Sequence, residues 1–140
     1  LQPAQATELW LAITSVPDPT RRLLVAGDFN SSPVDVSPIG VLTAYQQLTS
    51  GMLLNGYPMP FAFTDVWNLR PGNPAGLTCC ELEDLSNSPS LNYERVDLVF
   101  AFPAPLGKTK ANVLNADVED KTLSGLWPSD HASVSARLTY

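Results

Sequence analysis

Three short polar clusters hold the side chains best suited to chemistry. They are GDFN at residues 27–30, RVD at 95–97 and SDH at 129–131, and each lies beside an apolar stretch typical of a β-strand. Rigid strands hold side chains in place better than loops do. Carboxylates that converge from separate strands can bind one hard divalent cation through their oxygen atoms. The clusters together therefore indicate a cation-dependent site at the ends of strands.

Each cluster alone also has a simpler interpretation. Asp28 and Asn30 are frequent turn residues, because both side chains bond readily to nearby backbone groups. His131 could be a surface histidine with ordinary hydrogen bonds, and Arg95 could be one partner of a structural salt bridge. Only the combination of the three clusters, in this order along the chain, favours a shared chemical role.

Two helices and a buried strand are predicted in the first part of the chain. A helix is expected over 3–15, where apolar side chains recur at helical spacing. The run at 23–26 is continuously apolar, which predicts a strand buried on both faces, and it delivers Asp28 into a loop. A second helix is expected over 37–50, because Ser-Pro suits a helix start and Gly51 suits a helix end.

The remainder of the chain predicts loops and further strands. Residues 51–92 are rich in Pro, Gly, Asn and Ser, which indicates loops with short strands. Strands are expected at 95–102 and, more weakly, at 110–118. The stretch 132–138 alternates apolar and polar residues, which is typical of a half-buried strand. These elements predict a layered α/β or α+β fold in one unit, residues 1–140.

Composition limits the classes of function. The chain has 140 residues, 44% of them hydrophobic, and a net charge of -6. The acidic balance opposes tight, sequence-blind binding to polyanions, although a bound cation would still permit a nucleic acid substrate. No apolar run approaches the roughly 18 residues of a membrane span.

The two cysteines and the prolines say little about the compartment. Cys79 and Cys80 are adjacent, a spacing that rarely suits a disulfide and fits no zinc pattern, so packing residues or free thiols are expected. Thirteen prolines and few lysines lean toward a secreted protein. The compartment stays open.

In this order the three clusters resemble those of the endonuclease/exonuclease/phosphatase family. That DNase I-like family includes nucleases, abasic-site endonucleases, neutral sphingomyelinases and inositol polyphosphate phosphatases. The resemblance covers nearly the whole chain, with the first helix and the segments 65–67 and 76–78 in corresponding places. It implies a hydrolase that cleaves phosphoesters with Mg²⁺ or Mn²⁺ as cofactor.

The resemblance also implies a role for each polar side chain. His131 would contact the scissile phosphate, held by a hydrogen bond to Asp97, since a neighbouring carboxylate favours the charged imidazole and raises its pKa. Asp28 would orient or deprotonate the attacking water, and Asn30 would donate hydrogen bonds to the phosphate. Asp130 would bind or position the metal. Which carboxylate serves as base and which touches the metal is left open by the sequence.

The role of Thr78 and the choice of substrate both stay open within the same resemblance. Thr78 would contact substrate, although a threonine before two cysteines in a strand is more often structural. Substrate choice among nucleic acid, lipid head group and small phosphoester depends on loops. The net charge of -6 tilts the expectation toward a small or lipid phosphoester.

The family fold is a four-layer α/β sandwich, and the chain resembles its C-terminal half, with a mixed or antiparallel sheet and helices on one face. The N-terminal half, which would supply a metal-binding Glu, is expected to lie outside these residues. Half a sandwich leaves one sheet face apolar and bare. The expected partners are therefore the missing half or a second copy of the chain, and the isolated chain is expected to be inactive. The alternative is a non-catalytic fragment or interaction module that retains the fold.

Overall fold

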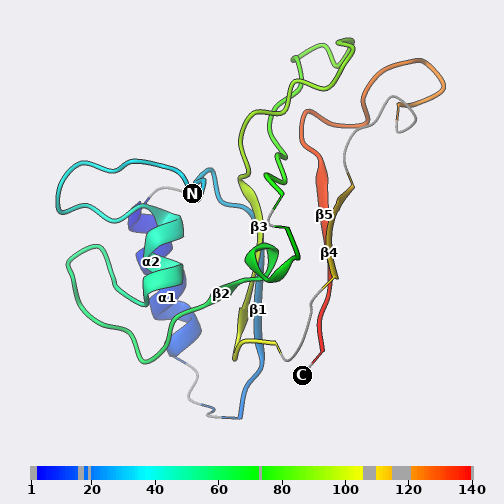
Figure 1. Ribbon diagram of the computed structural model, residues 1–140. Coiled ribbons are helices and arrows are strands. Elements are labelled where there is room, and N and C mark those ends of the chain that lie inside the picture. Colours follow the sequence, from blue (N-terminus) through cyan, green and yellow to red (C-terminus); the bar gives the residue numbers. More distant parts are fainter. Residues whose placement is uncertain are drawn as a thin grey trace.

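The computed structural model describes residues 3–15, 18, 20–72, 74–105, 110–114 and 121–139. Within them the chain forms two α-helices, a short 3-10 helix and five strands (Figure 1). In chain order these are α1 (Pro3–Thr14), β1 (Leu23–Asp28), α2 (Ala44–Ser50), β2 (Thr64–Asp65), η1 (Val66–Leu69), β3 (Asp97–Phe102), β4 (Lys110–Leu114) and β5 (Ser133–Arg137).

The strands form two antiparallel groups. One is a three-stranded sheet in the order β1-β3-β2, and the other is the pair β4-β5. Figure 1 shows α1 and α2 on one side of the sheet and the β4-β5 pair on the other, where β5 contacts β3. The prediction of a layered α+β fold with helices on one face of an antiparallel sheet is therefore confirmed.

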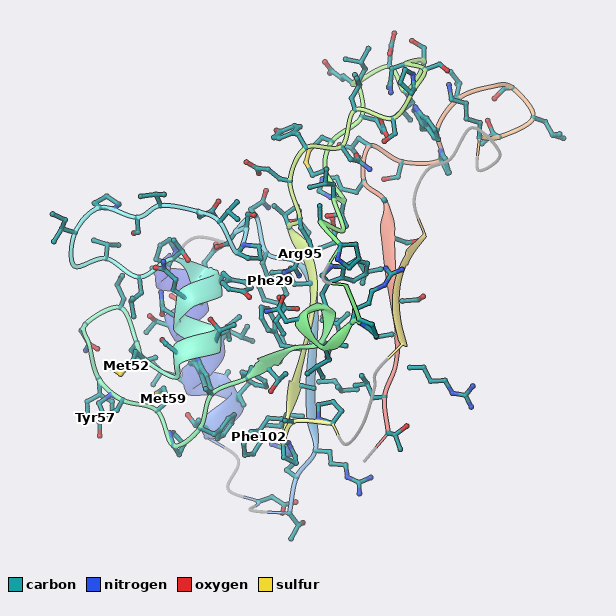
Figure 2. All side chains as sticks on the ribbon, in the orientation of Figure 1. Phe29, Met52, Tyr57, Met59, Arg95 and Phe102 are labelled. Carbon is teal, nitrogen blue, oxygen red and sulfur yellow. A yellow bond between two sulfur atoms is a disulfide. The ribbon has the colours of Figure 1, made fainter. Side chains whose placement is uncertain are left out.

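The helix-facing side of the sheet contains the larger apolar core. Side chains alternate along a strand, so Leu98 and Phe100 of β3 point to the same face and pack with Trp10, Leu48 and Phe63. Phe29 meets Phe100 edge to face, with ring centroids 5.1 Å apart. Phe29 and Phe102 lie toward opposite ends of this same face (Figure 2).

A buried glutamine ties the two helices together. The side chain of Gln47 in α2 is fully buried, and its amide nitrogen donates to the Pro3 carbonyl of α1 at 2.8 Å. Its side-chain oxygen accepts from Thr7 Oγ1, also at 2.8 Å. Trp10 Nε1 donates to the backbone carbonyl of Gln47. Because a buried amide is costly without partners, these bonds fix how α1 lies on α2.

The second helix is shorter than predicted. It was expected over 37–50 but begins at Ala44, so the predicted start was wrong. Thr43 is the N-cap, and a capping box joins it to Gln46 in both directions. The Ser-Pro pair instead opens a turn, in which the Val41 amide donates to the Pro38 carbonyl. The predicted end is confirmed, since Gly51 adopts the left-handed conformation at φ 67°.

The predicted strands lie close to their expected positions, but the predicted burial of the first one was wrong. Strand β1 includes the predicted 23–26, yet burial on both faces was wrong, because Leu24 is 59% exposed and Ala26 is exposed too. Strand β3 starts at Asp97, two residues later than expected. Strand β4 ends at Leu114, and residues 115–118 of that prediction lie outside the described residues. Strand β5 is half-buried as predicted.

Two smaller expectations were also tested. The predicted loops of 51–92 are present, interrupted only by β2 and η1 among the described residues. The expectation for the two cysteines holds in part: Cys79 is buried as a packing residue, whereas neither cysteine is a free thiol, because the two sulfurs contact each other. Within the part of the chain that the structure describes, no helix is long and apolar enough to cross a membrane.

Candidate functional site

Two carboxylates face each other at one end of the sheet. Strands β1 and β3 are antiparallel, so the last residue of β1 pairs with the first residue of β3, and these are Asp28 and Asp97. They lie on the face of the sheet opposite the helices, because Leu98 points into the helix-covered core. Like charges directly across a strand pair are destabilising. The arrangement therefore favours a positive partner beside the two carboxylates.

His131 supplies one such partner. It lies just before β5, and its Nδ1 is 2.8 Å from Oδ2 of Asp97, so the predicted hydrogen bond is confirmed. A carboxylate can only accept, so Nδ1 carries the hydrogen and Nε2 is left for other contacts. The side chains of His131 and Asp97 are 24% and 20% exposed. The pair is therefore shielded on one side and accessible on the other.

The pKa of His131 is raised above its ordinary value. Partial burial disfavours the charged ring, but the hydrogen bond that His131 donates to Asp97 and the negative charge of Asp97 outweigh it. Asp130 and Asp28 add further negative charge nearby. The imidazolium form is thus favoured, as the sequence predicted, and a protonated ring can donate to an anionic oxygen.

The backbone around His131 is fixed by its neighbours. The hydroxyl of Ser129 accepts from the His131 amide at 3.1 Å, which closes a short turn before β5. Cys79 forms an isolated antiparallel bridge with His131. Cys80 Sγ lies 3.9 Å from His131 Nε2. These contacts hold the ring where Asp97 can reach it.

Asp28 and Asn30 are bonded to each other. The Asn30 amide nitrogen donates to Asp28 Oδ1 at 2.8 Å, and Asn30 Nδ2 donates to Asp28 Oδ2 at 3.1 Å. Asn30 has φ 45°, a left-handed conformation that asparagine tolerates better than most residues. The turn-forming interpretation of this pair is therefore present in the structure. Asp28 itself is exposed and remains accessible to a ligand.

The donor atoms suit a divalent cation. Ligand atoms of Asp28, Asp97 and His131 all lie within 4.8 Å of one another. The two carboxylates can bind Mn²⁺ or Mg²⁺ through their oxygens, whereas His131 can be a ligand only in its neutral form. Asp130, the predicted metal residue, is not in this group among the described residues; it is exposed, and Ser129 Oγ donates to it at 3.3 Å.

Thr78 and Arg95 are both buried. Thr78 has no exposed surface, and its Oγ1 accepts from the backbone amides of Val96 and Asp97, which fits the structural interpretation of this residue. Arg95 forms a buried salt bridge with Asp65 at 2.7 Å. That pair therefore fits the structural interpretation of Arg95 as well.

Two residues important around the site were not predicted. Asp65 is 3% exposed, and besides Arg95 it accepts from Tyr45 Oη and caps η1 through the Trp67 amide. Glu81 is also buried, and its backbone amide donates to the Asp130 carbonyl. Asp65 lies in the segment 65–67 that the family resemblance includes, but its role was not predicted, and Glu81 is a single acidic residue in an ordinary sequence context.

Two surface hollows lie near the site without including the Asp97–His131 pair. One of about 240 Å³ is lined mainly by loop residues, among them Ser32, Leu77 and Tyr93. Another of about 250 Å³ is lined by residues that include Asn30 and Ser31. The histidine and its carboxylate therefore lie outside both hollows.

Comparison of the chain with models of protein families, with curated proteins and with solved structures gave no match. The resemblance to the endonuclease/exonuclease/phosphatase family consequently stays a prediction. It depends on the three clusters and on how the structure groups them.

Proposed function

We propose that this chain forms one side of a divalent-cation-dependent phosphoester hydrolase of the endonuclease/exonuclease/phosphatase type. The observation that supports it most is the Asp97–His131 hydrogen bond with Asp28 directly across the strand pair. Residues from all three predicted clusters meet here, although they lie up to 103 positions apart, from 28 to 131. The proposed fold is the C-terminal half of a four-layer sandwich.

The proposed chemistry uses each group according to its charge. Protonated His131 would donate to a phosphoryl oxygen and stabilise the negative charge that develops there. Asp28 would orient or deprotonate the attacking water. The carboxylates of Asp28 and Asp97 would hold Mg²⁺ or Mn²⁺. Asp130, whose negative charge acts on His131, would help to position the metal through a bound water. The cation would neutralise phosphate charge and polarise the phosphoryl group.

The site is proposed to be complete only when a further segment covers its open side. Strand β1 is an edge of the described sheet, and on its outer face Leu24 and Ala26 are exposed. Apolar side chains beside a polar site favour burial against another surface. The covering element is proposed to be either the missing half of the sandwich or a second copy of the chain.

A non-catalytic interaction module is the second candidate. One observation favours it: the Asn30 side chain donates to Asp28, so the two groups expected to face phosphate and water satisfy each other. In that case the same bare face would serve only to bind a partner. Substrate class is proposed from charge alone, and the net charge of -6 favours a small or lipid phosphoester over nucleic acid.

Hydrolysis assays separate these candidates. Bis(p-nitrophenyl) phosphate would be incubated with Mg²⁺ or Mn²⁺ and either this chain or the longest polypeptide that its coding sequence encodes. We expect turnover that EDTA abolishes. Turnover only in the longer polypeptide would indicate that its additional segment covers the face, whereas a rate per chain that rises with concentration would indicate a second copy.

The negative result is equally informative. If neither polypeptide hydrolyses a phosphodiester or the monoester p-nitrophenyl phosphate at any concentration, or if EDTA leaves the rate unchanged, the proposed function is refuted. The interaction module is then the candidate to pursue, and sedimentation at increasing concentration would show whether the chain binds itself.

A further inference from the structure

The segment at Thr78 and Cys79 lies between the residues that precede β3 and those that precede β5. Cys79 forms antiparallel bridges with Glu94 on one side and with His131 on the other. Glu94 precedes β3 and His131 precedes β5. The segment therefore connects the three-stranded sheet to the β4-β5 pair next to the Asp97–His131 hydrogen bond.

Thr78 bonds to both neighbours at once. Its Oγ1 accepts from the Val96 amide at 3.2 Å and from the Asp97 amide at 3.1 Å. Its backbone carbonyl accepts from the Ala132 amide at 2.8 Å, and its own amide donates to the Glu94 carbonyl at 2.7 Å. One residue thus bonds to the backbone of Asp97 and to the residue that follows His131.

Because Thr78 is buried, the two amides depend on its hydroxyl as their acceptor. Thr78 has no exposed surface, so water cannot replace the hydroxyl as acceptor for the two amides. A buried amide without an acceptor is unfavourable, and the backbone would shift to find one. A shift at Asp97 moves the carboxylate that orients His131. Functional groups of this kind tolerate displacements of only about 0.5 Å.

We propose that Thr78 is a positioning residue that sets the Asp97–His131 geometry through its buried hydroxyl. It does not contact substrate, in contrast to the role that the family resemblance implies. The geometric part of this proposal is independent of hydrolysis, and only its effect on turnover rests on the proposed function.

A matched pair of variants tests the role in the full chain. Thr78→Val keeps the shape and removes the acceptor, whereas Thr78→Ser keeps the hydroxyl. The readout is the NMR resonance of the His131 Nδ1 hydrogen, which the short bond to Asp97 protects from exchange with water. We expect this resonance in the wild type and in Thr78→Ser and its loss in Thr78→Val. In the active polypeptide, kcat should fall about 10- to 100-fold in Thr78→Val, with KM nearly unchanged.

Each outcome decides the proposal. An unchanged His131 resonance in folded Thr78→Val overturns it, whatever the hydrolysis assay gives. Loss of the resonance in a protein without hydrolytic activity supports the positioning role and counts against the proposed function alone. If Thr78→Val does not fold, amide exchange in the wild type decides, because an Asp97 amide that exchanges as fast as an exposed loop amide would overturn the proposal.

Discussion

The two faces of the β1-β3-β2 sheet are built from the same strands but have opposite properties. On the helix side, Phe100 and Leu98 are buried among aromatic rings, with α1 and α2 over them. On the other side, Asp28 and Asp97 face each other and Leu24 is exposed. Alternation along each strand places the core on one face and the polar site on the other.

The second face is itself only partly covered. Val99 and Ala101 of β3 pack with Val66 and with residues 136 and 138 next to or in β5. The same face of β1 has no comparable cover among the described residues, since Leu24, Ala26 and Asp28 are exposed. Stability is therefore expected to depend on the helix side, and function on the open side.

Truncating a side chain on each face should show the largest difference between the two faces in the free energy of unfolding. Phe100→Ala removes a fully buried ring and should lower the free energy of unfolding by about 3–5 kcal/mol. Leu24→Ala, on the open face, should change it by no more than about 0.5 kcal/mol. Urea denaturation of both variants measures this. Similar losses in both would show that the open face is covered in solution.

Loss of the buried Arg95–Asp65 salt bridge should have the second-largest effect on the free energy of unfolding. Asp65→Asn leaves the Arg95 guanidinium buried without its counter-charge, at a cost of about 3 kcal/mol in the free energy of unfolding. The exposed carboxylate of Asp84 offers a control, and Asp84→Asn should leave the free energy of unfolding nearly unchanged. Equal denaturation midpoints for the two variants would contradict the assigned role of Asp65.

The cap of α2 should have a smaller effect on the helix-covered side. Thr43→Ala removes the hydroxyl that accepts from the Gln46 amide and should cost about 1 kcal/mol. Thr43→Ser keeps the acceptor and should be close to the wild type. Thermal unfolding of both variants provides the measurement, and an unaffected Thr43→Ala would argue against the capping box.

The smallest expected effect is the pH dependence of the open side. The folded-state pKa of His131 is raised above 6.5, so its pairing with Asp97 contributes stability that is fully present below pH 6.5. That contribution is lost as the pH rises through the folded-state pKa. The difference in unfolding free energy between wild type and Asp97→Asn should therefore shrink as the pH rises from 6.5 through the folded-state pKa of His131. A difference that grows with pH would contradict the assigned charge of the pair.

Local patterns predicted the elements and the grouping of the polar clusters better than the packing. The polar clusters at 27–30, 95–97 and 129–131 follow directly from residue type, and their meeting at one end of the sheet agrees with the expectation that strand ends form sites. The apolar run at 23–26 predicted a strand, but it could not show that one face of the strand is exposed. Exposure depends on what else packs there.

Long-range pairings were the hardest features to predict. Arg95 forms its salt bridge with Asp65, thirty residues earlier in the chain. Neither residue type nor spacing indicates that partner. The start of α2 was missed because the Thr43–Gln46 capping box competes with the earlier Ser-Pro signal, and only the structure shows which one prevails. Thr78 was ambiguous for the same reason, since its buried partners come from distant segments.

Turnover of a His131→Ala variant tests the central claim most directly. In the polypeptide that shows EDTA-sensitive hydrolysis, this change removes the side chain that Asp97 orients. We predict that kcat falls by at least about 100-fold while the fold is retained, with Asp84→Asn as the control that leaves the rate unchanged. Turnover in His131→Ala within about twofold of the wild type would contradict the account.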